Sequence, residues 1–194
     1  MVRPPRSSLV CLMALLWLAT PLPVEGEGSV TVYAGRLTTN GWEDFFVNPE
    51  EIEYRDSFLL AVAPSRVLAT PLPGLTLEAE GQVVRHFGRQ AHWEVNTALV
   101  GRWHDFPWDD HVRSTAAFGV GPSWAGERPD EEKAIDSGET RRLLAYWVME
   151  VTAAPAQWTN WAASLRLHHR STAYGLLADE GGANVLALGV RRRF

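Results

Sequence analysis

The chain has 194 residues, enough for one domain with a full-sized core or for one small barrel. Its formal net charge of -5 gives no support to a nucleic-acid partner, for which a basic stripe is expected. Nine Trp residues are unusual, and Trp collects at interfaces between water and lipid.

Residues 1–26 are predicted to form a secretory signal peptide. Arg3 and Arg6 give a basic start, and the apolar run 9–19 follows. A bilayer-spanning helix needs about 20 apolar residues, so this run is too short to span, and an uncleaved anchor is the weaker alternative. The single cysteine, Cys11, lies inside this segment, so the mature chain has neither disulfides nor thiol chemistry.

The remaining residues, 27–194, alternate apolar and polar side chains in eight segments and contain no convincing helix. Such alternation predicts β-strands, because neighbouring residues of a strand point to opposite faces. No later window has the length and low charge of a membrane-spanning helix, so a membrane form would have to be a closed barrel. The predicted strands are 29–37, 54–68, 75–87, 92–103, 112–120, 141–151, 158–171 and a last strand ending at Phe194.

The connections differ in length in a way that is typical of outer-membrane barrels, which have long external loops and short periplasmic turns. The longest are 38–53, 122–138 and 172–183, while 104–111 and 152–157 are shorter. The tight connection 88–91 and the rather long 69–74 fit this scheme less well. We therefore predict an all-β fold, an eight-stranded antiparallel transmembrane β-barrel. The alternative is a secreted soluble β-sandwich or lipocalin-like barrel.

The polar faces of the strands predict a filled, charged interior. An eight-stranded barrel has room for side chains but for no wide channel. Buried charges need partners, so we expect Glu–Arg pairs across the lumen. The predicted inward residues are Glu78, Glu80, Glu94, Asn96, Arg102, Arg166, His168 and Arg170.

Two polar loops resemble metal sites but have simpler interpretations. The segment 104–111 contains two His and three Asp residues, and we predict a polar turn that carries the interfacial residues Phe106 and Trp108. The acidic run 127–139 could bind divalent cations, but we favour a solvated external loop.

The segment 158–171 carries the residues that point to chemistry. His169 and Ser171 share the parity of Leu165 and Leu167, so they belong to the apolar face of the strand. Ser becomes a nucleophile when His takes its proton, and a carboxylate usually orients that His. Because both chain ends of such a barrel are periplasmic, these residues should face lipid at the outer leaflet.

The chain carries His169-Arg170-Ser171 on its penultimate predicted strand and ends in Arg-Phe. A small barrel with these features resembles the outer-membrane lipid A 3-O-deacylases (PagL type). That family consists of eight-stranded barrels with a His-Ser-Glu triad on the lipid-facing surface. Its members hydrolyse the acyl ester at position 3 of lipid A without a metal or other cofactor. The resemblance implies His169 as general base, Ser171 as nucleophile, and lipid A as partner in the Gram-negative outer membrane.

The sequence departs from the family at two positions. Thr172 stands where the family has an Asn that is thought to help the oxyanion hole, and Ala183 stands where its acid lies. The nearest acids are Glu180, which we prefer as third member, and Asp179. Two hypotheses therefore stand: an esterase acting on lipid A, and a non-catalytic structural or lipid-binding outer-membrane barrel. The oligomeric state stays open.

Overall fold

A computed structural model describes residues 27–136, 140–177 and 181–194. The predicted signal peptide and the two candidate acids, Asp179 and Glu180, lie outside these residues. The chain forms one closed barrel of eight antiparallel strands. The elements are β1 (Gly28–Thr38), α2 (Asp44–Val47), a 3₁₀ turn (Pro49–Glu51), β2 (Tyr54–Leu72), β3 (Leu75–Gly88), β4 (Trp93–Trp103), β5 (Val112–Ala125), α3 (Asp130–Asp136), β6 (Leu143–Pro155), β7 (Trp161–Ser171) and β8 (Gly182–Arg193).

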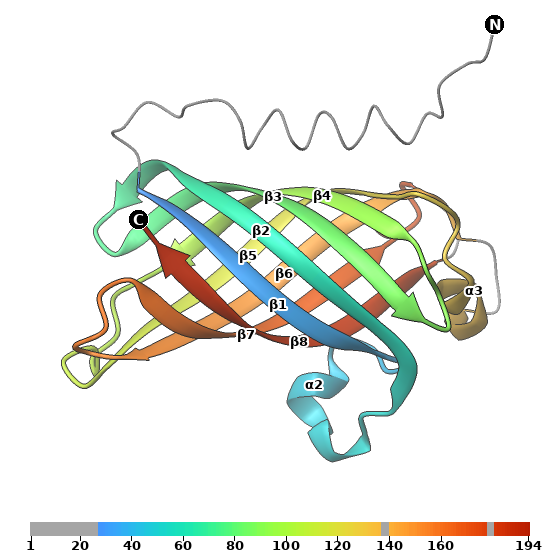
Figure 1. The fold of residues 1–194 in the computed structure, drawn as a ribbon, viewed down its shortest axis with the longest axis horizontal. Helices are drawn as coiled ribbons and strands as arrows, with labels where there is room; N and C mark the ends of the chain where they lie inside the picture. The colour runs from blue at the N-terminus through green and yellow to red at the C-terminus, as the bar shows by residue number, and fades with distance from the viewer. Residues whose placement is uncertain (1–26, 137–139, 178–180) are drawn as a thin grey trace, which may run out of the picture.

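Each strand pairs with its neighbours in sequence, and β1 closes the barrel by pairing with β8. Figure 1 shows the start of β1 beside the C-terminus at one end of the barrel, with α3 at the other end. Closure leaves no free sheet edge, which is what a strand structure in lipid requires. The predicted eight-stranded antiparallel barrel is thus confirmed. Among the described residues, no helix has the length and hydropathy to cross a membrane.

Several strands extend further than the sequence predicted. β2 runs to Leu72 and pairs it with Leu75, so the supposed long turn 69–74 shrinks to two residues. One of these is Gly74, whose φ of +77° suits glycine. Likewise, β5 and β6 continue past their predicted ends because the two strands keep pairing. By contrast, β7 begins at Trp161 rather than at 158.

The prediction that the chain contains no helix is wrong for two loops. The short helix α2 lies in the connection between β1 and β2, and α3 lies between β5 and β6. Glu131 of α3 pairs with Arg55 at 2.7 Å, and Glu132 pairs with Arg170 at 2.5 Å. Both glutamates are buried, so the predicted solvated loop is wrong for these two acids, whereas Glu127 and Asp130 of the same run are exposed. Arg55 and Arg170 of the barrel form ion pairs with these two glutamates and compensate their charge.

The lumen contains the predicted ion pairs. All eight residues predicted to point inward are buried. Arg166 binds both oxygens of Glu80 at 2.9 Å and also contacts Glu150. His168 lies between Glu94, at 3.0 Å, and Tyr33, at 3.2 Å, as a satisfied lumen residue. This charged network occupies the interior together with buried apolar residues such as Leu59, Val84 and Val185.

The outer wall is apolar. Large side chains around the whole barrel point outward and are exposed over about half of their surface. A continuous apolar belt of this kind suits a lipid environment rather than water. Its members include Val32, Leu60, Val62, Leu99, Phe118, Val120, Val151, Leu165, Leu188 and Val190.

The turn 104–111 is a polar turn, as predicted. Asp109 accepts hydrogen bonds from the backbone N–H groups of Phe106 (3.1 Å) and Ser114 (2.9 Å). The rings of Phe106 and Trp108 stack with centroids 5.1 Å apart. Asp109 therefore shapes the turn between β4 and β5, and this turn carries the two aromatic rings.

Candidate active site on the outer barrel wall

His169 occupies a row of three side chains on the outer wall. The strand register places Trp147 of β6 on one side of it and Asn184 of β8 on the other. His169 Nδ1 donates a hydrogen bond to Asn184 Oδ1 at 2.7 Å. The Asn184 Nδ2 group donates to the backbone carbonyl of Asn40 at 2.8 Å, which fixes the orientation of the amide. In the neutral ring this leaves Nε2 as the basic nitrogen.

Aromatic rings cover the other side of His169. The rings of Trp147 and His169 lie 4.4 Å apart with an interplanar angle of 31°. Trp42, from the connection between β1 and β2, meets Trp147 edge to face at 5.9 Å. His169 is therefore only partly exposed, and its ring is held between an amide and an indole. A base that is held in one orientation loses little conformational freedom when it acts.

Ser171 lies two residues further along β7, on the same face. Its cross-strand neighbours are Ala145 of β6 and Gly182 of β8, the two smallest residue types. The hydroxyl is thus flanked by space that a substrate carbonyl could enter. Residues at i and i+2 of a strand are about 6–7 Å apart at Cα. Within the described part of the chain, no hydrogen bond joins Ser171 to His169, so a side-chain rotation is needed for proton transfer.

The backbone after Ser171 is unusual. Ala173 and Tyr174 have φ of 53° and 56°, a left-handed conformation that costs non-glycine residues energy and gathers at functional sites. The N–H of Ala173 points to Ser171 Oγ at 3.4 Å. Thr172, at the position where an oxyanion-hole Asn was sought, instead accepts a hydrogen bond from the N–H of Gly175 at 3.4 Å. The Ala173 N–H is therefore bonded to the candidate nucleophile itself, and the Thr172 hydroxyl is engaged in the loop.

The structure places an amide, not a carboxylate, beside His169 among the residues that it describes. Glu180 and Asp179 lie outside the described residues, so their role stays a prediction. The group that contacts His169 is Asn184, one position beyond the Ala183 where the resemblance placed an acid. Sequence reasoning sought a carboxylate and overlooked this amide. The signal was present, because Asn184 shares the parity of Leu186 and Leu188 on the outer face of β8.

An apolar groove of ≈ 890 Å³ runs along the same wall. The α2 connection contributes Phe45 and Phe46, while the barrel contributes Leu167 and Leu186, among others. Leu167 points outward on β7, two residues before His169, yet only 6% of it is exposed. Pockets that hold drug-sized ligands measure about 300–1,000 Å³. The groove is therefore large enough for an acyl chain.

One group of side chains in the lumen has metal-ligand chemistry. Ligand atoms of His86, His92 and Glu94 lie within 4.8 Å of one another. The two imidazoles stack at 4.3 Å with an interplanar angle of only 12°, so their nitrogens point side by side and do not converge. Arg170 also lies 3.9 Å from Glu94. His86 bonds to Glu94 at 2.8 Å and so belongs to the lumen network, whereas neither ring nitrogen of His92 has a hydrogen-bond partner among the described residues.

Comparison with known proteins shows a shared fold. No protein-family model matches the chain, and no curated protein sequence matches it. The crystal structure of the outer membrane enzyme PagL superposes with a TM-score of 0.56 at 11% identity, covering 84% of this chain and 98% of that one. Neisserial surface protein A superposes with a TM-score of 0.50 at 10% identity, covering 88% and 100%. The chain thus has the architecture of outer-membrane β-barrels.

Proposed function

We propose that the protein is an outer-membrane esterase that removes an ester-linked acyl chain from lipid A. The observation that carries this proposal is the oriented His169, whose Nδ1–H donates to Asn184 at 2.7 Å on the apolar face that also carries Ser171. A base and a hydroxyl on a lipid-facing wall have a lipid ester as their natural substrate. The fold shared with the enzyme PagL is consistent with this function.

In the proposed reaction, Ser171 Oγ attacks the acyl carbonyl carbon while His169 Nε2 takes the hydroxyl proton. His169 then gives this proton to the sugar oxygen that leaves. Water attacks the acyl-serine with His169 again acting as base, which releases the fatty acid and restores the serine. Asn184 holds the ring in the reactive tautomer, as Asn does in Cys-His-Asn enzymes.

Two further features bear on the proposal. The Ala173 N–H donates to Ser171 Oγ at 3.4 Å, and it would have to turn from this oxygen to the substrate carbonyl to serve as an oxyanion donor. The apolar groove is lined by Leu167, two residues before His169 on β7, and by Leu186, so it could hold the acyl chain during attack.

The proposed location is the Gram-negative outer membrane, reached with the signal peptide 1–26. With both chain ends in the periplasm, odd-numbered strands run outward, and β7 ends at the outer surface with Ser171. The active face then meets the outer leaflet, which contains lipopolysaccharide.

The deciding experiment is mass spectrometry of lipid A from cells that express the wild type or Ser171→Ala. We expect the wild type to remove one acyl chain and the variant to leave lipid A intact. Ser164→Ala is the matched control, because Ser164 lies on the same strand but is buried in the lumen. Intact lipid A in all three strains, with each protein present in the outer membrane, would refute the esterase.

A non-catalytic lipid-binding barrel is the second candidate. It is favoured by the lack of a hydrogen bond between Ser171 and His169 and of a carboxylate bonded to His169 among the described residues. In that case the groove would hold an acyl chain without cleaving it. This candidate predicts that the purified protein retains lipopolysaccharide. Ser171→Ala should leave this retention unchanged, whereas a substitution that fills the groove should abolish it.

A further inference from the structure

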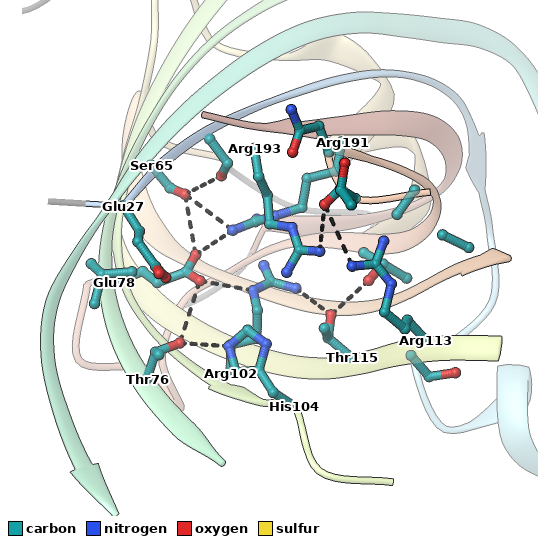
Figure 2. A pocket seen from close by; sticks show the side chains of 18 of the residues that line it. Glu27, Ser65, Thr76, Glu78, Arg102, His104, Arg113, Thr115, Arg191 and Arg193 are labelled. Atoms are coloured by element: carbon teal, nitrogen blue, oxygen red, sulfur yellow. Dashed lines mark hydrogen bonds and ion pairs between the residues drawn. The ribbon is translucent and has the colours of Figure 1, made fainter. Parts of the chain in front are cut away.

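A polar pocket of ≈ 560 Å³ opens at the end of the barrel where β1 begins and β8 ends. It lies in the lumen, away from the candidate active site. Figure 2 shows four guanidinium groups gathered in this space, those of Arg102, Arg113, Arg191 and Arg193. They come from strands β4, β5 and β8, which the closed barrel brings together.

Two of these arginines converge without a counterion. Arg113 and Arg193 both donate to one neutral acceptor, the backbone carbonyl of Thr159, at 3.5 Å and 3.0 Å. Neither makes an ion pair with any carboxylate in the part of the chain that the structure describes. Arg113 is partly buried and Arg193 is exposed, so the two like charges repel each other with a repulsion that solvent partly screens. A bound anion would remove it.

The same pocket contains buried guanidinium nitrogens that have no hydrogen-bond acceptor. These are Nη2 of Arg102, Nε and Nη2 of Arg113, and Nη1 of Arg191. Nη1 of Arg191 lies 3.6 Å from Glu150 without hydrogen-bond geometry. Buried donors are rarely left unsatisfied in native proteins, and an ion or water commonly accounts for the exceptions. Several such donors around one pocket indicate a place for an acceptor with several oxygens.

One acid of the pocket wall, Glu78, is paired with two of the pocket's own arginines, and another, Asp109, is bonded within its turn. Glu78 accepts hydrogen bonds from Arg102 at 3.0 Å and from Arg191 at 2.8 Å. Asp109 is bonded to backbone N–H groups of its own turn. Glu27 and Asp110 also line the pocket, and they are the acids against which an incoming anion must compete. Arg113 and Arg193 both line the pocket, and two buried nitrogens of Arg113 have no hydrogen-bond acceptor among the described residues.

We propose that this pocket is a binding site for an oxyanion of the phosphate class. Arginine presents its N–H groups as a planar fork that matches the oxygens of a phosphate, so two or three converging forks can bind it with several charge-assisted hydrogen bonds. The proposal rests on the lumen alone and is independent of the esterase chemistry.

The test is calorimetric titration of sodium phosphate into the mature protein folded in neutral detergent micelles. A chloride titration at matched ionic strength is the reference. Saturable binding of phosphate with no comparable signal from chloride supports the site. If phosphate and chloride give equal binding signals with the wild-type protein, the proposal is refuted, and this outcome does not depend on any variant.

The variant Arg113→Gln/Arg193→Gln should lower the affinity for phosphate at least tenfold. The control Arg36→Gln/Arg192→Gln removes the same charge from outward-facing positions and should stay within twofold. Folding of each variant is checked by the heat-dependent gel shift. If the double variant does not fold, Arg113→Lys takes its place, since it keeps the charge and loses the fork. Wild-type affinity in the folded variant would refute the assignment of the site.

A parallel titration with glycerol 3-phosphate identifies the source of the ligand. Tighter binding of this ester than of inorganic phosphate would assign the site to phosphate esters such as lipid headgroups. The reverse order would assign it to the free ion. Either order supports an oxyanion site, whereas failure of both ligands to bind excludes it.

Discussion

His169 donates its Nδ1–H to Asn184, and Asn184 in turn donates its amide to the carbonyl of Asn40. The amide thus has one orientation, and the histidine ring has one tautomer. Because a neutral amide sets this tautomer, the basic nitrogen is defined without the help of a carboxylate. A carboxylate would in addition stabilise the charged ring that forms during proton transfer.

We expect Asn184→Leu to lower esterase activity by roughly 100-fold, the effect that is common when a base loses its orienting partner. Asn184→Asp, which keeps an acceptor for Nδ1–H, should retain or exceed wild-type activity. Both are measured as the rate of fatty-acid release from lipid A in micelles. Equal loss in the two variants would show that Asn184 acts only through the fold, and activity unchanged in both would exclude it as a positioning residue.

The apolar groove should set the acyl-chain preference. We expect Leu167→Trp to fill the groove beside His169 and to reduce kcat/KM for long acyl esters about tenfold. Short esters should change by less than about twofold, because they place few methylenes in the groove and each buried methylene contributes about 0.8 kcal/mol. The measurement compares p-nitrophenyl esters of different chain lengths. Leu188→Trp is the control, because this exposed position on the same wall does not line the groove. A uniform loss for all chain lengths would contradict a role of the groove in specificity.

The lumen network should dominate the stability of the barrel. Glu150 pairs with Arg102 and with Arg166, and all three are buried. Glu150→Ala should destabilise the protein by about 3–5 kcal/mol, because it leaves buried cations without a partner. Asp56→Ala removes the exposed pair with Arg36 and should cost less than about 1 kcal/mol. Urea unfolding followed by tryptophan fluorescence measures both, and similar costs would argue against the network.

The buried acid of α3 should make stability depend on pH. Burial raises the pKa of Glu132 above its usual value of 4.5, although Arg170 and a hydrogen bond from Thr140 act in the opposite direction. The neighbouring Glu94 adds to the rise, and His86 opposes it.

A raised folded-state pKa gives stability below the unfolded pKa, and this stability is lost as the pH rises through the folded value. The melting temperature of Glu132→Gln should therefore rise relative to that of the wild type as the pH increases from 4 to 8. Thermal unfolding in micelles across this range measures the difference. A difference that does not change with pH would show that Arg170 keeps the acid ionised throughout.

Local periodicity was sufficient to predict the barrel and the outward position of His169 and Ser171. Strand parity is a local property, and the alternation in β7 is regular from Leu165 onward. The same parity predicted which charges enter the lumen. What parity could not supply was the identity of their partners, because Arg166 meets Glu80 from a strand on the other side of the barrel.

The contact to Asn184 and the groove could not be predicted for a similar reason. The contact depends on the register between β7 and β8, and the orientation of the amide depends on Asn40 from the far end of the sequence. The groove depends on how α2 packs over the outer wall of the barrel, and no local pattern in the sequence predicts this packing. These features arise from packing between segments that are distant along the chain.

The last strand has a consequence for when the site can exist. β8 carries Asn184, pairs with β7 on one side, and joins β1 on the other. His169 thus acquires its partner only when the final strand closes the cylinder and the Asn40 loop is in place. A chain still in transit, with β8 unpaired, has a serine and a histidine but no oriented base. In the proposed esterase, the base would therefore become oriented only when the barrel closes.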